Sequence, residues 1–137
     1  MLTANPPPTP PVAIRTTLPS IFTSLTRISN ASDPLKFAID EISYKPFISL
    51  FNLTGAAAAD PALAAIVDYA SVVALELHAP SDGQGGGPTV SVRFKNGTTD
   101  GAFHDVPIFG APSVSLARFV AELAVSVCSF FFFSRVV

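Results

Sequence analysis

Few side chains in this 137-residue sequence have the type and spacing that catalysis or metal binding requires. Its histidines are His78 and His104, and its single cysteine is Cys128. No two potential metal ligands show the spacing of one helix face or one hairpin, so we expect no metal site and no cofactor. Cys128 has no basic neighbour that would favour a reactive thiolate, and no Gly-x-Ser-x-Gly motif marks a nucleophilic serine. We therefore expect the histidines at structural or surface positions.

A glycine-rich stretch at residues 83–87 invites comparison with phosphate-binding loops. Such loops continue into Lys-Ser or Lys-Thr at the start of a helix, whose backbone amides face the phosphate. Here Pro88 and an alternating apolar pattern follow instead. We interpret the stretch as the flexible tip of a hairpin.

Three Asn-x-Ser/Thr sequons begin at Asn30, Asn52 and Asn96. Each falls at the end of a predicted helix or strand, where an attached glycan would project into solvent. Together they indicate a secreted protein, although the first residues lack the basic start and apolar core of a signal peptide.

The composition points to a chain that is mostly buried. Apolar residues make up 49% of it and charged residues 13%, which is about half the usual charged fraction. A net charge of −2 excludes a nucleic-acid binder that relies on phosphate neutralisation. A single cysteine excludes an internal disulfide framework.

We expect three regions along the chain. Residues 1–15 form a Pro-rich, disordered leader, because proline fixes φ and removes a backbone donor. Residues 16–124 form one α/β portion, and residues 125–137 an apolar tail. The uncharged run at residues 123–133 is shorter than the roughly 20 residues of a membrane span, so we do not expect it to cross a membrane.

Within the folded portion the apolar spacing predicts two to three helices and a short mixed sheet. The helices are expected at residues 16–28, from near Lys45 to Leu53, and after a cap at Ser113 or Ser115. The inner face of the last helix is predicted to carry Leu116, Phe119, Val120 and Leu123.

Three strands and one extended segment complete the prediction. Residues 35–39 are expected to form a short buried strand, and residues 68–78 an interior strand that is apolar on both faces. The latter pairs with residues 90–95 as a hairpin, in which Val90, Val92 and Phe94 point inward and Glu76 lies near Arg93 or Lys95. Residues 102–109 are predicted to be extended.

Four segments in this order resemble the C-terminal part of fungal histidine acid phosphatases, members of the phosphoglycerate-mutase-like superfamily. The segments are DPLKFAIDEISYKPFISLFNLTG, AIVDYASVVALELHA, VSVRFKNGTTDGAFHDVPIFG and SLARFVAEL. The resemblance covers roughly residues 16–124 and implies an α/β fold that is part of a phosphoglycerate-mutase-like domain. It implies a secreted enzyme that hydrolyses phosphate monoesters at acid pH.

In that family a histidine in an Arg-His-Gly motif attacks phosphorus, and a later His-Asp or His-Glu pair brings the carboxyl group that protonates the leaving alcohol. This sequence contains no Arg-His-Gly. The resemblance places Glu41, or Asp40 in the neighbouring register, roughly at the proton donor's position, with no histidine beside it. The His104-Asp105 dipeptide lies too late in the chain to be that pair.

The resemblance therefore implies a chain that is inactive alone and whose partner is the missing N-terminal part of the same domain. The alternative is a small non-enzymatic protein that associates with a membrane or a partner through its apolar C-terminus, residues 119–133. A fragment would gain order with the missing part, whereas a membrane-associated protein would partition into detergent.

Overall fold

The sheet is built around one strand, β2 (Thr89–Lys95), in a computed structural model that describes residues 13–80 and 86–128. On one side β2 pairs with β1 (Val72–His78). On the other it pairs with β3 (His104–Val106) and, further along, with β4 (Ser113–Ser115). Every one of these pairings is antiparallel, so the predicted mixed sheet is wrong. Consecutive strands are joined without the long crossover that parallel pairing needs.

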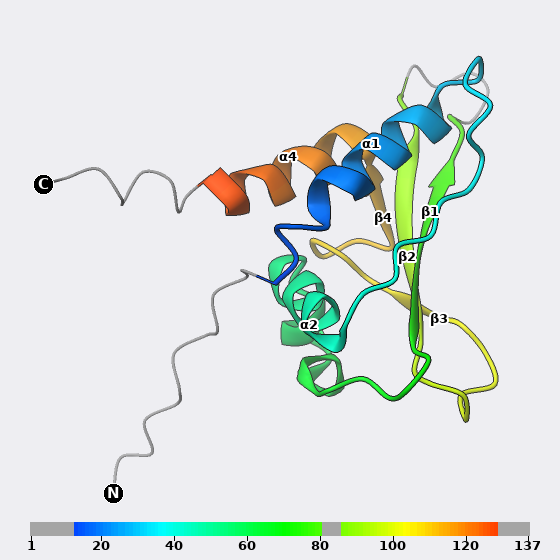
Figure 1. Cartoon of the computed structure of the whole chain (residues 1–137). Helices are drawn as coiled ribbons and strands as arrows, with labels where there is room; N and C mark the ends of the chain where they lie inside the picture. The colour runs from blue at the N-terminus through cyan, green and yellow to red at the C-terminus, as the bar shows by residue number, and fades with distance from the viewer. Residues whose placement is uncertain (1–12, 81–85, 129–137) are drawn as a thin grey trace, which may run out of the picture.

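The two faces of β2 differ as its alternation predicts. Val90, Val92 and Phe94 are 0–7% exposed and point into the core, while Ser91 and Arg93 point to the opposite face. Figure 1 shows the helices on one side of the sheet only. The described residues therefore form two layers, and none of their helices covers the polar face of the sheet.

Strand β1 differs from its prediction as an interior strand over residues 68–78. It begins at Val72 and is an edge strand, because within residues 13–80 and 86–128 it pairs with β2 alone. Its inward residues are only half-buried. The preceding residues turn instead of extending: Ser71 N–H donates to the Asp68 carbonyl at 3.2 Å, and Ala70 adopts φ 61°.

The longer helices agree with the apolar spacing. Helix α1 (Leu18–Ser29) and helix α4 (Leu116–Cys128) lie across one end of the sheet, and α2 (Tyr44–Leu53) covers the other end (Figure 1). Two short turns, α3 (Ala56–Ala59) and η1 (Pro61–Ala64), follow α2.

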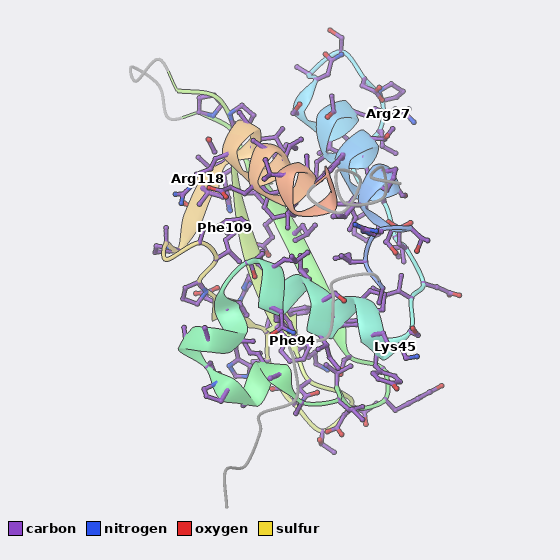
Figure 2. All side chains as sticks on the ribbon, turned by 90° about the vertical axis from the view of Figure 1, so that its left-hand side faces the viewer. Arg27, Lys45, Phe94, Phe109 and Arg118 are labelled. Atoms are coloured by element: carbon purple, nitrogen blue, oxygen red, sulfur yellow. The ribbon has the colours of Figure 1, made fainter. Side chains whose placement is uncertain are left out.

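The core lies between these helices and the inner face of the sheet. Its largest fully buried members are Leu18, Phe51, Phe119 and Leu123 from α1, α2 and α4, together with Ile108 from the segment between β3 and β4. Phe51 meets Phe94 edge-on, with ring centroids 5.2 Å apart, and Figure 2 shows Phe94 at the edge of α2. Ile14 is 2% exposed and belongs to this core, although the prediction assigned it to the leader.

Residues 107–112 leave the sheet between β3 and β4. Phe109, at φ 50°, donates its N–H to the carbonyl of buried Thr54 at 2.7 Å, which ties this excursion to the end of α2. The guanidinium of Arg118 on α4 lies 5.8 Å from the centre of the Phe109 ring (Figure 2). Ser115 Oγ accepts the Arg118 N–H at 3.2 Å, which confirms Ser115 as the predicted cap.

The buried strand predicted at residues 35–39 does not form. Residues 35–43 run as an extended connection from α1 to α2 (Figure 1), and no helix or strand is assigned there. Phe37 and Ile39 are both 74% exposed. The alternating apolar pattern is present, but the part of the chain that the structure describes pairs no strand with it.

Candidate functional site

The two carboxylates predicted as proton-donor candidates lie on the exposed connection between α1 and α2. Asp40 Oδ1 accepts a hydrogen bond from Ser20 Oγ of α1 at 2.9 Å, and Glu41 lies three residues before α2. Both are exposed. Within the described ranges neither carboxylate forms an ion pair with a histidine or an arginine, so they do not form a catalytic constellation by themselves.

His78 lies on the opposite, uncovered face of the sheet, near the end of β1. Its Nε2 atom is 2.8 Å from Ser91 Oγ on β2. A histidine within this distance of a serine hydroxyl is the core of a nucleophile–base pair. In this fold the pair lies on an open sheet face, and among the described residues no further side chain hydrogen-bonds to the imidazole to orient it. The geometry therefore indicates a surface hydrogen bond between His78 and Ser91 and no nucleophile–base pair.

Arg93 is held between two carboxylates on the same sheet face. Its Nη1 is 3.4 Å from Glu76 Oε1, which confirms the predicted cross-strand contact. Its Nε is 3.2 Å from Asp105 Oδ1, an ion-pair distance without the alignment of a hydrogen bond. The guanidinium also lies 5.8 Å from the ring centre of Phe103. Because two acidic groups already compensate this charge, Arg93 is poorly placed to bind a phosphoryl group.

His104 pairs with Asp100 and not with its sequence neighbour. His104 Nε2 is 2.9 Å from Asp100 Oδ1, and Asp100 also accepts the backbone N–H groups of Asn96 and Ala102 at 3.0 and 3.2 Å. These hydrogen bonds, the one from Asn96 above all, lower the pKa of Asp100 to about 2. The Asp100 carboxylate therefore holds the turn after β2 in place. Since His104 contacts this carboxylate, the His104-Asp105 dipeptide has a structural role.

The three sequons occupy different environments, although each asparagine is exposed. Asn30 ends α1, and its Oδ1 accepts the Ser32 N–H at 3.0 Å. In the second sequon Thr54 is 1% exposed and donates its hydroxyl to the Leu50 carbonyl at 2.8 Å. Asn96 Oδ1 accepts the Asp68 N–H and the Ser71 hydroxyl, which fastens two loops together.

An open groove of about 680 Å³ lies between the end of α1 and the start of α4. Its lining is mainly apolar or small, and none of the predicted site residues contributes to it: the residues are Thr26, Ser29, Gly87, Pro88, Ser115, Leu116, Ala117, Val120 and Ala121. No group of three or more histidine, cysteine, aspartate or glutamate side chains in the described portion is arranged to hold a metal ion.

The apolar C-terminal region bears on the alternative reading of residues 119–133. Phe119 and Leu123 are completely buried in the core, so the part of α4 that carries them packs inside the protein. The remainder, residues 129–133, lies outside the described residues. None of the helices in the described ranges combines the length and apolarity that crossing a membrane requires.

The most unusual feature of the described surface is where its large hydrophobic side chains are exposed. Seven of the eight lie between the end of α1 and the start of β1: Phe37, Ile39, Ile42, Tyr44, Ile66, Tyr69 and Val72. Val125 on α4 is the eighth. For Phe37 and Ile39 the signal in the sequence is the apolar alternation before α2. The same alternation predicted a buried strand at residues 35–39.

Comparisons with known proteins do not assign the chain to a family. No protein-family model matches it. Neither the curated proteins nor the solved structures contain a match.

Proposed function

We propose that this chain is the C-terminal, donor-bearing portion of a histidine-acid-phosphatase-like domain and is inactive until a second portion supplies the Arg-His-Gly nucleophile. The observation that carries the proposal is the exposure of Phe37 and Ile39, 74% each, immediately before Asp40 and Glu41. Five further large hydrophobic side chains between the end of α1 and the start of β1 are exposed, and apolar side chains gathered on a surface are typical of an interaction site. It lies where the resemblance places the proton donor.

The proposed reaction needs both portions. A neutral histidine of the second portion attacks phosphorus, the bond to the leaving oxygen breaks, and Glu41 or Asp40 donates a proton to that oxygen. Water then displaces the histidine and releases phosphate. Covering Phe37 and Ile39 would also desolvate the neighbouring carboxyls, and desolvation favours the protonated form that a donor requires.

The proposal also covers the location, the glycosylation and the substrates of the parent enzyme. A secreted, fungal glycoprotein would carry glycans at Asn30, Asn52 or Asn96, and its substrates would be phosphate monoesters. The resemblance supports this setting, together with the exposure of all three asparagines.

Hydrolysis of p-nitrophenyl phosphate near pH 5 tests the proposal. The purified chain alone is expected to show no turnover above its Glu41→Gln variant. Mixing or co-expressing it with the Arg-His-Gly-containing N-terminal portion of a fungal histidine acid phosphatase, cut before that enzyme's own donor, is expected to restore turnover. A mixture that stays inactive contradicts the proposal, as does turnover by the chain alone that is lost in His78→Gln or His104→Gln.

The leaving group separates the donor's role from a structural one. An alkyl phosphate such as glycerol 2-phosphate has a poor leaving group and needs protonation, whereas p-nitrophenolate needs little. In the mixture, the loss of general-acid catalysis in Glu41→Gln is expected to slow alkyl phosphate hydrolysis by about 10²–10⁴-fold and to slow p-nitrophenyl phosphate hydrolysis much less. Asp40→Asn tests the neighbouring register, and Glu122→Gln on α4 is the matched control. Equal loss with both substrates argues against a donor role.

A further inference from the structure

Asn96 precedes Gly97 at the end of β2, and its side chain holds the loop that leads into β1. Its Oδ1 accepts the Asp68 N–H at 2.9 Å and the Ser71 hydroxyl at 3.1 Å. Because the Asp68 N–H can only donate, the oxygen of the amide and not its nitrogen faces this loop. We call Asn96, Asp68 and Ser71 the loop clasp. It lies at the end of the sheet where the chain enters β1 and leaves β2 (Figure 1).

The fold requires a glycine directly after Asn96. Gly97 is buried and holds φ +80°, and a Cβ placed there would lie 2.6 Å from the Cβ of Asp68. A glycine in this position also leaves its backbone nitrogen unshielded, because it carries no side chain. The loop therefore demands the neighbour that best exposes the Asn96 amide to attack by the backbone.

An asparagine followed by glycine can deamidate, a reaction that needs only water. The Gly97 nitrogen bonds to Cγ of Asn96, the Cγ–Nδ2 bond breaks, and the proton of the Gly97 amide leaves with Nδ2 as ammonia. Water then adds to either carbonyl of the resulting cyclic imide and opens the ring. The product is aspartate or, where the chain now runs through the former side chain, isoaspartate.

In the folded loop this ring closure competes with four hydrogen bonds. Two of them are those of the loop clasp. In addition, the Asn96 N–H donates to Asp100 Oδ2 at 3.0 Å, and the Gly97 N–H donates to the Lys95 carbonyl at 3.3 Å. Ring closure joins the Asn96 side chain to the Gly97 nitrogen and removes the Gly97 proton. The loop therefore has to open locally before the reaction can proceed.

We propose that Asn96 is a site of spontaneous deamidation and that the loop clasp slows this reaction in the folded chain. The clasp joins residues 28 positions apart, and conversion to isoaspartate removes the side-chain amide that closes it. The carbon inserted into the backbone also displaces Gly97, which has no room to move towards Asp68. Deamidation is therefore expected to loosen both loops. The inference is independent of the proposed phosphatase function.

Incubation of the full chain at pH 7.4 and 37 °C, after production in a host that adds no glycan, tests the inference. Peptide mass spectrometry follows the conversion of Asn96, with Asn30 and Asn52 as internal references. In concentrated urea Asn96 is expected to convert fastest, because the side chains of Ala31 and Leu53 shield the other two backbone nitrogens. In the folded chain Asn96 is expected to convert at least about tenfold more slowly than in urea, since the hydrogen bonds of the clasp have to break.

A matched pair of variants tests the clasp itself. Ser71→Ala removes a donor to Asn96 Oδ1 and a 2.7 Å hydroxyl bond to the carbonyl three residues earlier. Ser29→Ala removes the same kind of bond, also 2.7 Å long, from α1. Ser71→Ala is expected to speed conversion of Asn96 in the folded chain by about two- to tenfold and to leave the rate in urea unchanged. Ser29→Ala is expected to change neither rate, and thermal unfolding checks that both variants fold.

Conversion of Asn96 that is as fast in the folded chain as in urea overturns the inference, as does conversion in urea no faster than at Asn30 and Asn52. Faster conversion in the folded chain also overturns it, because the hydrogen bonds to Oδ1 would then activate the amide carbonyl. Equal folded-state rates in Ser71→Ala and Ser29→Ala contradict protection by the clasp.

The converted protein provides a separate readout. Ion exchange separates it from the parent chain by its additional negative charge, and it is expected to unfold at a lower temperature. An unchanged thermal midpoint contradicts the loosening of the two loops.

Discussion

The imidazole of His104 lies 2.9 Å from the carboxylate of Asp100, four residues earlier in the turn after β2. The same carboxylate accepts two backbone N–H groups. His104, whose neighbour Asp105 completes a His-Asp dipeptide, therefore belongs to the loop that connects β2 to β3 and pairs with Asp100 there.

This turn is expected to make stability depend on pH in the acid range. The pKa of Asp100 falls from 3.8 to about 2 on folding, so the stabilisation is fully present above pH 4 and is lost as the pH falls towards 2. Asp100→Asn is expected to lower the urea midpoint at pH 6 and to flatten its change between pH 4 and pH 2. Asp33, whose pKa is also lowered because it accepts hydrogen bonds from Arg27, contributes in the same direction and remains in the variant. An acid profile identical to that of the parent chain would contradict the assignment.

Gly97 is expected to tolerate no side chain. Its φ is +80°, and a Cβ placed there would lie 2.6 Å from the Cβ of Asp68. Gly97→Ala should therefore destabilise the fold by about 1–3 kcal/mol or more, measured by urea denaturation. Gly101→Ala, where a Cβ meets nothing within 4 Å, is the control and should stay close to the parent chain. Equal effects at the two positions would rule out this contact as the cause.

At Ala70 the reverse change, from alanine to glycine, is expected to stabilise the fold. It holds φ 61° in the turn before β1, a left-handed conformation that costs an alanine roughly 1–2 kcal/mol. Ala70→Gly removes this strain and adds about 0.4–1 kcal/mol of unfolded-state entropy, so a net gain of up to about 1 kcal/mol is expected. A rise in the thermal midpoint would confirm it, and a fall would show that the turn carries little strain.

Two phenylalanines should respond very differently to truncation. Phe51 is completely buried and packs edge-on against Phe94, so Phe51→Ala is expected to cost about 3–5 kcal/mol. Phe37, at 74% exposure, should change the stability of the isolated chain by less than about 0.5 kcal/mol. Denaturant titration of both variants distinguishes the two classes. A large loss from Phe37→Ala would mean that this side chain supports the fold of the chain itself.

The sequence predicted best those elements whose pattern is local. The apolar spacing of residues 16–28 and the alternation of residues 90–95 each describe a face that this fold buries, as α1 and β2 confirm. Hydrophobic alternation at residues 35–39 predicts a strand equally well, but a strand also needs a neighbour to pair with. Among the described residues none provides one.

The candidate site was predictable only in part. Residues 68–78 are apolar on both faces, which suggested an interior strand, but whether a strand lies inside or at an edge depends on pairing distant in sequence. The Asp100 turn depends on loops that meet through Asn96 and Asp68, 28 residues apart. The Asn96-Gly97 signal marked a turn there, and the acceptor role of Asp100 follows only from the folded loop.

The order of the strands has a consequence for how the chain folds. Among the described strands, β1 pairs with β2 and β2 with β3, so two of the pairings join strands that follow one another in the sequence, and β4 returns to pair with β2 after β3. The β1–β2 hairpin closes over residues 79–88 alone, a local connection whose closure costs little entropy, and hairpins form within about 1–10 microseconds. We expect this stretch to form the transition-state nucleus. α1 and α2 would dock later, because their contacts with the sheet span longer separations along the chain.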